Sequence, residues 1–116
     1  MSLAEIAYKA AGIMSERGFC QFTLQDEDRR VCHQGALMLA VTGRENVYID
    51  GNFWGFPWNL TPEQYKDFNE ISDVSREILA SRGWNHGVVD YNNDPGTTGE
   101  DVILLLKEAA AKLEEC

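Results

Sequence analysis

Cys32 and His86 are the residues whose types could support nucleophilic catalysis. A helix is expected to begin at His33, and a thiol at a helix start lies near the positive end of the helix dipole, which lowers its pKa and favours the thiolate. His86 lies beside an expected strand at 88–91, where Asp90 or Asn92 could orient its imidazole ring. Cys32, His86 and Asp90 are therefore the candidate catalytic residues of a thiol-dependent hydrolase.

A non-catalytic interpretation of Cys32 competes with this hypothesis. Cysteine followed by histidine is the chain order of papain-like thiol hydrolases, but the strand-rich region expected between them is replaced here by a helical pattern over 62–82. Cys32 also stands close to Gly35 and Ala36, and a cysteine in such a setting is often a small buried side chain. The sequence favours this second interpretation, and with it a protein that is not an enzyme.

The sequence lacks the usual motifs for binding zinc or a phosphate-containing cofactor. The soft ligands Cys20, Cys32, His33 and His86 include no Cys-x-x-Cys or His-x-x-x-His pair. The phosphate-binding patterns Gly-x-x-x-x-Gly-Lys and Gly-x-Gly-x-x-Gly do not occur, and neither does Gly-x-Ser-x-Gly. We therefore expect no zinc and no cofactor.

The segment that starts at residue 90 partly matches a calcium-binding loop. Positions 1, 3, 5 and 12 of an EF-hand loop would be Asp90, Asn92, Asp94 and Asp101. However, Pro95 occupies the place where that loop requires glycine, and the preceding segment is predicted to be a strand. We expect instead a turn around Asp94 that leads to a threonine helix cap.

Four aromatic residues stand close together in a segment broken by glycine and proline: Phe53, Trp54, Phe56 and Trp58. Exposed aromatic side chains often mark contact surfaces, because they provide a large contact area at low entropic cost. In a domain this small they could equally fold over the core. If they are exposed, they are the candidate partner-binding residues.

Composition indicates one acidic domain. The 116 residues fit a single domain over 1–116, with 44% hydrophobic residues for one core. A net charge of −9 argues against nucleic-acid binding but would suit a basic partner. The apolar runs are too short to cross a membrane, and Glu5 interrupts any secretory leader. Three cysteines are too few and odd for a disulfide framework, so we expect reduced thiols and a cytoplasmic location.

Hydrophobic periodicity and capping residues predict four helices. The first helix follows a Ser2–Glu5 capping box, and the second runs over 33–42. The third follows a Thr61–Gln64 capping box, and the fourth follows Thr97 or Thr98. The helix after Thr61 is either continuous or broken near residues 72–73. Short strands are expected at 20–24, 31–32, 47–49 and 88–91. The predicted fold is α+β: a mostly helical, small single domain of about four helices with a few short strands.

Two sequence blocks carry a family resemblance. The first is Cys32-His33-Gln34-Gly35-Ala36-Leu37, and the second runs over 88–98. The chain resembles a domain family of unknown function found in actinobacteria and their phages, whose members carry Cys-x-x-Gly-Ala-Leu and a Val-Val-x-Trp-Asn-Asp-type turn. Here Tyr91 replaces the common Trp, and an additional Asn precedes Asp94. The resemblance implies an actinobacterial or actinophage source and transfers no catalytic residue.

These observations predict a non-enzymatic accessory protein of an actinobacterium or actinophage. It would act through protein–protein contact in the cytoplasm, or in the host cytoplasm if it is encoded by a phage. The thiol-dependent hydrolase is the alternative.

Overall fold

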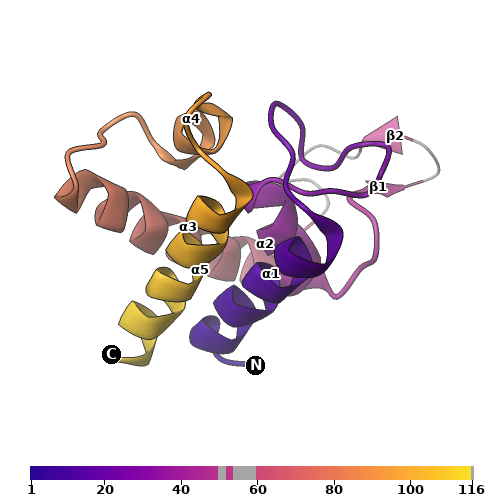
Figure 1. Cartoon of the computed structure of the whole chain (residues 1–116). Helices are drawn as coiled ribbons and strands as arrows, with labels where there is room; N and C mark the ends of the chain where they lie inside the picture. The colour runs from indigo at the N-terminus through magenta and orange to yellow at the C-terminus, as the bar shows by residue number, and fades with distance from the viewer. Residues whose placement is uncertain (50–51, 54–59, 116) are drawn as a thin grey trace.

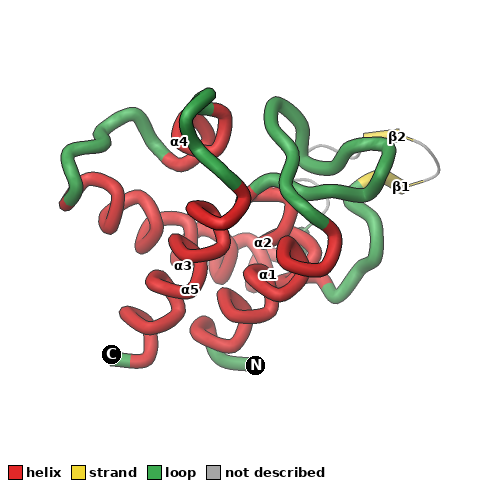
Figure 2. Tube along the Cα trace, viewed as in Figure 1, coloured by secondary structure: helices red, strands yellow, loops and turns green. Residues whose placement is uncertain are grey.

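The computed structural model describes residues 1–49, 52–53 and 60–115, and in this part of the chain helices dominate (Figures 1 and 2). The helices are α1 (Leu3–Arg17), α2 (His33–Thr42), α3 (Pro62–Ser81), α4 (Val88–Asn93) and α5 (Gly99–Glu114). Strands β1 (Tyr48–Ile49) and β2 (Asn52–Phe53) form an antiparallel pair, with Tyr48 opposite Phe53.

Side-chain caps begin the three longest helices. In α1, Ser2 and Glu5 form the predicted capping box, and in α3 Thr61 and Gln64 do the same. Thr98, rather than Thr97, caps α5 together with Asp101. Each box satisfies backbone N–H groups that lack partners at a helix start, so these residues determine locally where the helices begin.

Helix α2 spans the predicted residues and is the most apolar helix. Residues 35–40 are all buried, so most of its circumference contacts other elements. It ends at Gly43, whose left-handed backbone (φ 74°) lets its N–H bond to the Leu39 carbonyl. Helix α3 is continuous, and the break considered near residues 72–73 does not occur.

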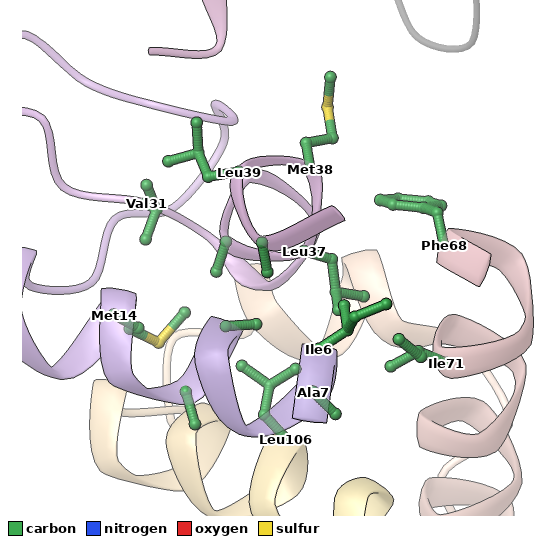
Figure 3. Packing of buried hydrophobic residues seen from close by; sticks show 14 of the residues in the cluster. Ile6, Ala7, Met14, Val31, Leu37, Met38, Leu39, Phe68, Ile71 and Leu106 are labelled. Carbon is green, nitrogen blue, oxygen red and sulfur yellow. The ribbon is translucent and has the colours of Figure 1, made fainter. Parts of the chain in front are cut away.

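The core lies where α1, α2, α3 and α5 meet. Helix α1 packs against α2 and α5, and α5 also packs against α3. Figure 3 shows Leu37 of α2 close to Ile6 of α1 and Ile71 of α3, with Leu106 of α5 below them. Ala7, Ala10, Ala11, Ala109 and Ala110 are buried and allow close approach of α1 and α5.

The mostly helical architecture is confirmed, but two predicted strands are wrong. Residues 88–91 belong to helix α4, because Val88 packs with Leu79 and Leu105 in a second cluster between α3 and α5. Residues 20–24 form no strand, since the positive φ of Phe22 (67°) interrupts an extended backbone. Among the described residues this gives five helices instead of about four.

Val31 retains part of the predicted pairing. It forms single bridges with Phe19 and Gln25, so the loop over 18–32 closes on itself as an irregular turn. None of the described helices has both the length and the hydrophobicity that crossing a bilayer requires.

Candidate functional site

The two sequence blocks singled out above meet at the N-terminus of α2. The Asn92 side chain is buried there and accepts a hydrogen bond from the His33 backbone N–H (2.9 Å). Its amide nitrogen donates to the Cys20 carbonyl (3.2 Å). One side chain of α4 therefore connects α2 with the loop over 18–32. Figure 1 shows this loop and α4 at the end of the molecule opposite the two termini.

The loop presents an aromatic ring to solvent. Phe22 is 79% exposed, and its φ of 67° is unfavourable for a bulky side chain. Its backbone N–H donates to Asn93 Oδ1 (2.8 Å). The neighbouring Gln21 amide donates to the carbonyls of Asn92 and Asp94. These contacts with α4 and the residue after it hold Phe22 in its strained conformation.

A pocket of about 200 Å³ lies beside this ring. Its apolar lining includes Phe22, Leu24, Cys32 and Val89, and its polar lining includes Gln34 and Asn93. Val89 is itself 52% exposed. The pocket and the two exposed apolar side chains therefore form one surface, which we call the Phe22 face (Phe22, Leu24, Cys32, Gln34, Val89 and Asn93).

Backbone donors determine how the asparagine amides at this face are oriented. Because the His33 N–H must bond to an oxygen, Asn92 Oδ1 is the acceptor and Asn92 Nδ2 is the donor. The Phe22 N–H requires Asn93 Oδ1 in the same way. The Asn93 amide nitrogen is then a donor with no hydrogen-bond partner among the described residues, in a side chain that lines the pocket.

Gln34, which also lines the pocket, is held by hydrogen bonds to Ser72 of α3 and to His33. Its Oε1 accepts from the Ser72 hydroxyl (3.2 Å) and lies 3.0 Å from His33 Nδ1. An amide oxygen only accepts, so Nδ1 of the neutral His33 carries the proton, and Nε2 accepts from Ser75 (3.0 Å). Burial lowers the pKa of His33 to about 4, so this buried ring is neutral near pH 7.

Cys32 is the N-cap of α2 and is buried. Its sulfur accepts a hydrogen bond from the Gly35 N–H (3.3 Å). Burial raises the pKa of Cys32 and outweighs the bonds from backbone N–H groups, which act to lower it. Burial likewise raises the pKa of Cys20 to about 12, and its thiol donates to the Arg30 carbonyl (3.3 Å). The surroundings of both thiols favour the protonated form.

His86 and Asp90 are exposed. The His86 ring packs edge-to-face against Trp84, with ring centroids 5.3 Å apart, and Asp90 lies in the first turn of α4. Within the described part of the chain, the hydrogen bond of the Cys32 sulfur goes to Gly35 and not to His86. The structure thus places Cys32 at the pocket without joining it to the candidate base.

The residues considered as metal ligands serve other contacts. Asn92 is occupied by His33 and Cys20, and Asp94 Oδ1 accepts from the Gly96 N–H (2.8 Å) as expected for a turn. Over residues 1–49, 52–53 and 60–115 no three His, Cys, Asp or Glu side chains gather in a group that could hold a metal ion.

The candidate partner-binding residues fall mostly outside the described residues. The backbone of Phe53 pairs in β2, whereas Trp54, Phe56 and Trp58 are not described. Their role in binding stays a prediction.

Sequence reasoning missed the Phe22 face. It assigned Phe22 to a half-buried strand and Val89 to another strand, and it gave Gln34 and Asn93 no role. No local signal marks Phe22, because a positive φ is normally read from glycine or asparagine.

Comparison with known proteins identifies a family. The model of a family described as a family of unknown function, DUF6197, matches residues 1–112. No curated protein and no solved structure matches the chain.

Proposed function

The chain belongs to this family of unknown function, and from its described surface we propose that it is a small non-enzymatic accessory protein that binds another protein. The observation that carries the proposal is the Phe22 face, where an exposed ring on a strained backbone borders an apolar pocket. Such strain costs on the order of 1–3 kcal/mol and is often associated with functional sites. The core does not require this ring, since the ring lies in solvent.

The size of the pocket supports a side chain as its ligand. Sites for drug-sized molecules usually have volumes of about 300–1,000 Å³. A pocket of about 200 Å³ is smaller and fits one large apolar side chain of a partner. Phe22 and Val89 would add apolar contact around that anchor, as in the centre of many protein interfaces.

Other parts of the proposal rest on the sequence. Phe53, Trp54, Phe56 and Trp58 are proposed as a second contact region, and the source as an actinobacterium or its phage. The proposed location is the cytoplasm, supported by free thiols at Cys20 and Cys32. The thiol hydrolase is supported less well, because Cys32 has a raised pKa and its sulfur accepts from Gly35.

Binding of a model side chain tests the proposal. N-acetyl-phenylalanine amide is titrated into the ¹⁵N-labelled protein, with N-acetyl-glycine amide as the control ligand. We expect chemical-shift changes centred on the amides of Phe22, Val89 and Asn93. Phe22→Ser and Val89→Ser should weaken binding at least about fivefold, as expected when apolar contact is lost. Leu104→Ser removes from α5 an apolar side chain about as exposed as Val89 (54% and 52%) and should leave binding unchanged.

Two results would contradict the proposal. One is shifts scattered over the surface without a maximum at the Phe22 face. The other is binding by the Phe22 and Val89 variants equal to that of wild type. The second contact region is tested separately by pull-down from a host lysate, with wild type compared against Trp54→Ala and Trp58→Ala.

A further inference from the structure

We infer that the Phe22 face selects a peptide segment in which an apolar side chain stands next to lysine or arginine. The inference rests on the proposed function and names the chemistry of the partner. Three observations carry it: the charges around the pocket, the free amide donor of Asn93, and the pattern of charges that a second copy of this chain would bring.

The residues that line the pocket carry no charge, but two acidic residues, Asp90 and Asp94, directly follow lining residues in the sequence, and we call these two the acidic rim. Asp90 directly follows Val89 and is exposed, and Asp94 directly follows Asn93. Neither carboxylate takes part in an ion pair within the described residues. In the loop that carries Phe22, the Arg30 guanidinium contacts Asp26 (2.6 Å) and Asp28 (3.6 Å), so its charge is compensated. Arg29 forms no ion pair within the described residues, but its guanidinium donates to the Glu45 carbonyl (3.2 Å), and neither arginine lines the pocket. A cation beside the apolar anchor would therefore meet uncompensated negative charge.

Asn93 supplies a polar contact that a peptide can use. Its oxygen is held by the Phe22 N–H, so its amide nitrogen remains available to donate at the edge of the pocket. A peptide carries a carbonyl acceptor next to each side chain. An apolar side chain in the pocket would thus place a backbone carbonyl near this donor.

A second copy of the chain fits the site less well. The exposed Phe22 ring lies beside a pocket, and such a self-complementary patch could form a two-fold dimer. The same symmetry would bring the acidic rims of both copies together, and each chain carries a net charge of −9. Like charges across an interface disfavour binding, so the observations favour a cationic partner.

Three tripeptides test the selectivity. Acetyl-Lys-Phe-Lys-amide, acetyl-Ser-Phe-Ser-amide and acetyl-Glu-Phe-Glu-amide are titrated into the ¹⁵N-labelled protein at low and at high salt. We expect the lysine peptide to bind about five- to tenfold more tightly than the serine peptide at about 20 mM NaCl, and the glutamate peptide to bind most weakly. At about 0.5 M NaCl the advantage should fall below about twofold, because salt screens exposed charges.

Two single-residue variants test whether the preference for the lysine peptide comes from the acidic rim. Asp90→Asn should reduce the preference for the lysine peptide at least about twofold and leave the affinity for the serine peptide unchanged. Glu114→Gln removes a charge from the far end of α5 and should leave the preference as in wild type. A preference that persists in Asp90→Asn, or that is equally lost in Glu114→Gln, would overturn the assignment.

The outcomes separate this inference from the proposed function. Equal binding of all three peptides would overturn the charge selection and leave the apolar anchor in place. Binding of none of them, together with no response to N-acetyl-phenylalanine amide, would overturn both. Sedimentation that shows a dimer lost in Phe22→Ser would assign the face to a second copy and would also overturn the cationic partner.

Discussion

Asn92 connects three segments through a single side chain. Its oxygen binds the first free N–H of α2, and its nitrogen binds the Cys20 carbonyl. A buried polar group without a partner destabilises the fold, so the His33 N–H and the Cys20 carbonyl both depend on the Asn92 side chain for a hydrogen bond. Because Phe22 is held by the adjacent Asn93, the position of the exposed ring also depends on this connection.

Asn92→Ala should destabilise the protein by about 2–4 kcal/mol, because it leaves the His33 N–H and the Cys20 carbonyl buried without this partner. Urea denaturation followed by circular dichroism measures the change. Asn85→Ala, at an exposed asparagine in a loop, serves as the control and should change stability by less than about 0.5 kcal/mol. Equal effects of the two variants would show that the Asn92 bonds contribute little.

His33 should make stability depend on pH. Its pKa is about 4 in the folded protein, because the ring is fully buried, and about 6.5 in the unfolded chain. Between these values the unfolded chain binds more protons, so stability falls as the pH decreases from about 6.5 towards 4. The slope should approach about 1.4 kcal/mol per pH unit.

Denaturation curves between pH 7 and 5 measure this slope, since most carboxylates titrate at lower pH. His33→Gln should flatten the dependence in this range, even if the variant is less stable throughout. His86→Gln, at the exposed histidine, should keep it. A slope retained in His33→Gln would assign the dependence to other groups.

The thiols should react slowly in the folded protein. Burial raises the pKa of Cys20 and Cys32, and the thiolate is the reactive form. In a Cys116→Ser background, labelling by a thiol reagent at pH 7 should be at least about 100-fold slower than in urea. Fast labelling of Cys32 without denaturant would instead support the thiol hydrolase.

At the scale of elements, glycines determine how closely the loop over 18–32 packs. A Cβ added at Gly35 of α2 would lie 1.9 Å from the Leu24 carbonyl oxygen. A Cβ at Gly99 would lie 2.7 Å from Phe19 Cβ. The loop therefore approaches α2 and α5 so closely at Gly35 and Gly99 that no larger residue fits without a shift, which explains why glycine stands at these two positions of this chain.

Gly35→Ala should therefore destabilise the protein by more than about 2 kcal/mol, because the loop must move away from α2. Gly12→Ala is the matched control, since the added Cβ at this exposed position in α1 meets no atom within 4 Å. Alanine has the higher helix propensity there, so stability should rise by about 0.5–1 kcal/mol. Thermal denaturation of both variants compares them, and a tolerated Gly35→Ala would contradict the close packing.

Helices were predictable where local residues determine them. Ser2 with Glu5 and Thr61 with Gln64 begin helices by bonding to their own backbone, and Gly43 ends α2 through its own conformation. Val88 and Val89 have strand propensity, yet the apolar cluster between α3 and α5 stabilises a helical turn there. That cluster forms from residues distant in the sequence, so no local pattern predicts it.

The candidate site was predictable only in part for a similar reason. Cys32 was correctly placed at a helix start, but the burial that raises its pKa comes from packing of the loop and α4. Phe22 and Asn93 lie 71 positions apart in the chain, and their hydrogen bond determines the Phe22 face. Contacts at such separation cannot be read from periodicity or spacing.

On the scale of the whole molecule, the core and the proposed contact surface lie at different places. The four longer helices enclose the core (Figure 3), whereas the loop over 18–32 and α4, which carry most of the Phe22 face, lie at the end away from both termini (Figure 1). The chain carries 19 acidic and 10 basic residues, so its surface repels itself as well as attracting cations.

Added salt should stabilise the protein because it screens this repulsion. Raising NaCl from about 20 mM to about 300 mM should increase the Tm by a few degrees. Differential scanning calorimetry measures the shift, and KCl should give the same result if screening is the cause. A decrease in Tm would show that the exposed ion pairs, such as Lys66–Glu70, contribute more than the net repulsion.

The left-handed backbone at Phe22 lowers the stability of the fold, while the ring that it carries contributes to the proposed contact surface. Glycine adopts this conformation without strain, so Phe22→Gly would relieve the backbone while it removes the ring. Phe22→Gly should therefore raise the Tm and weaken the proposed binding at the Phe22 face. Selection for thermal stability alone would therefore favour glycine at position 22, and a stabilised variant that is meant to keep the proposed contact surface should retain Phe22.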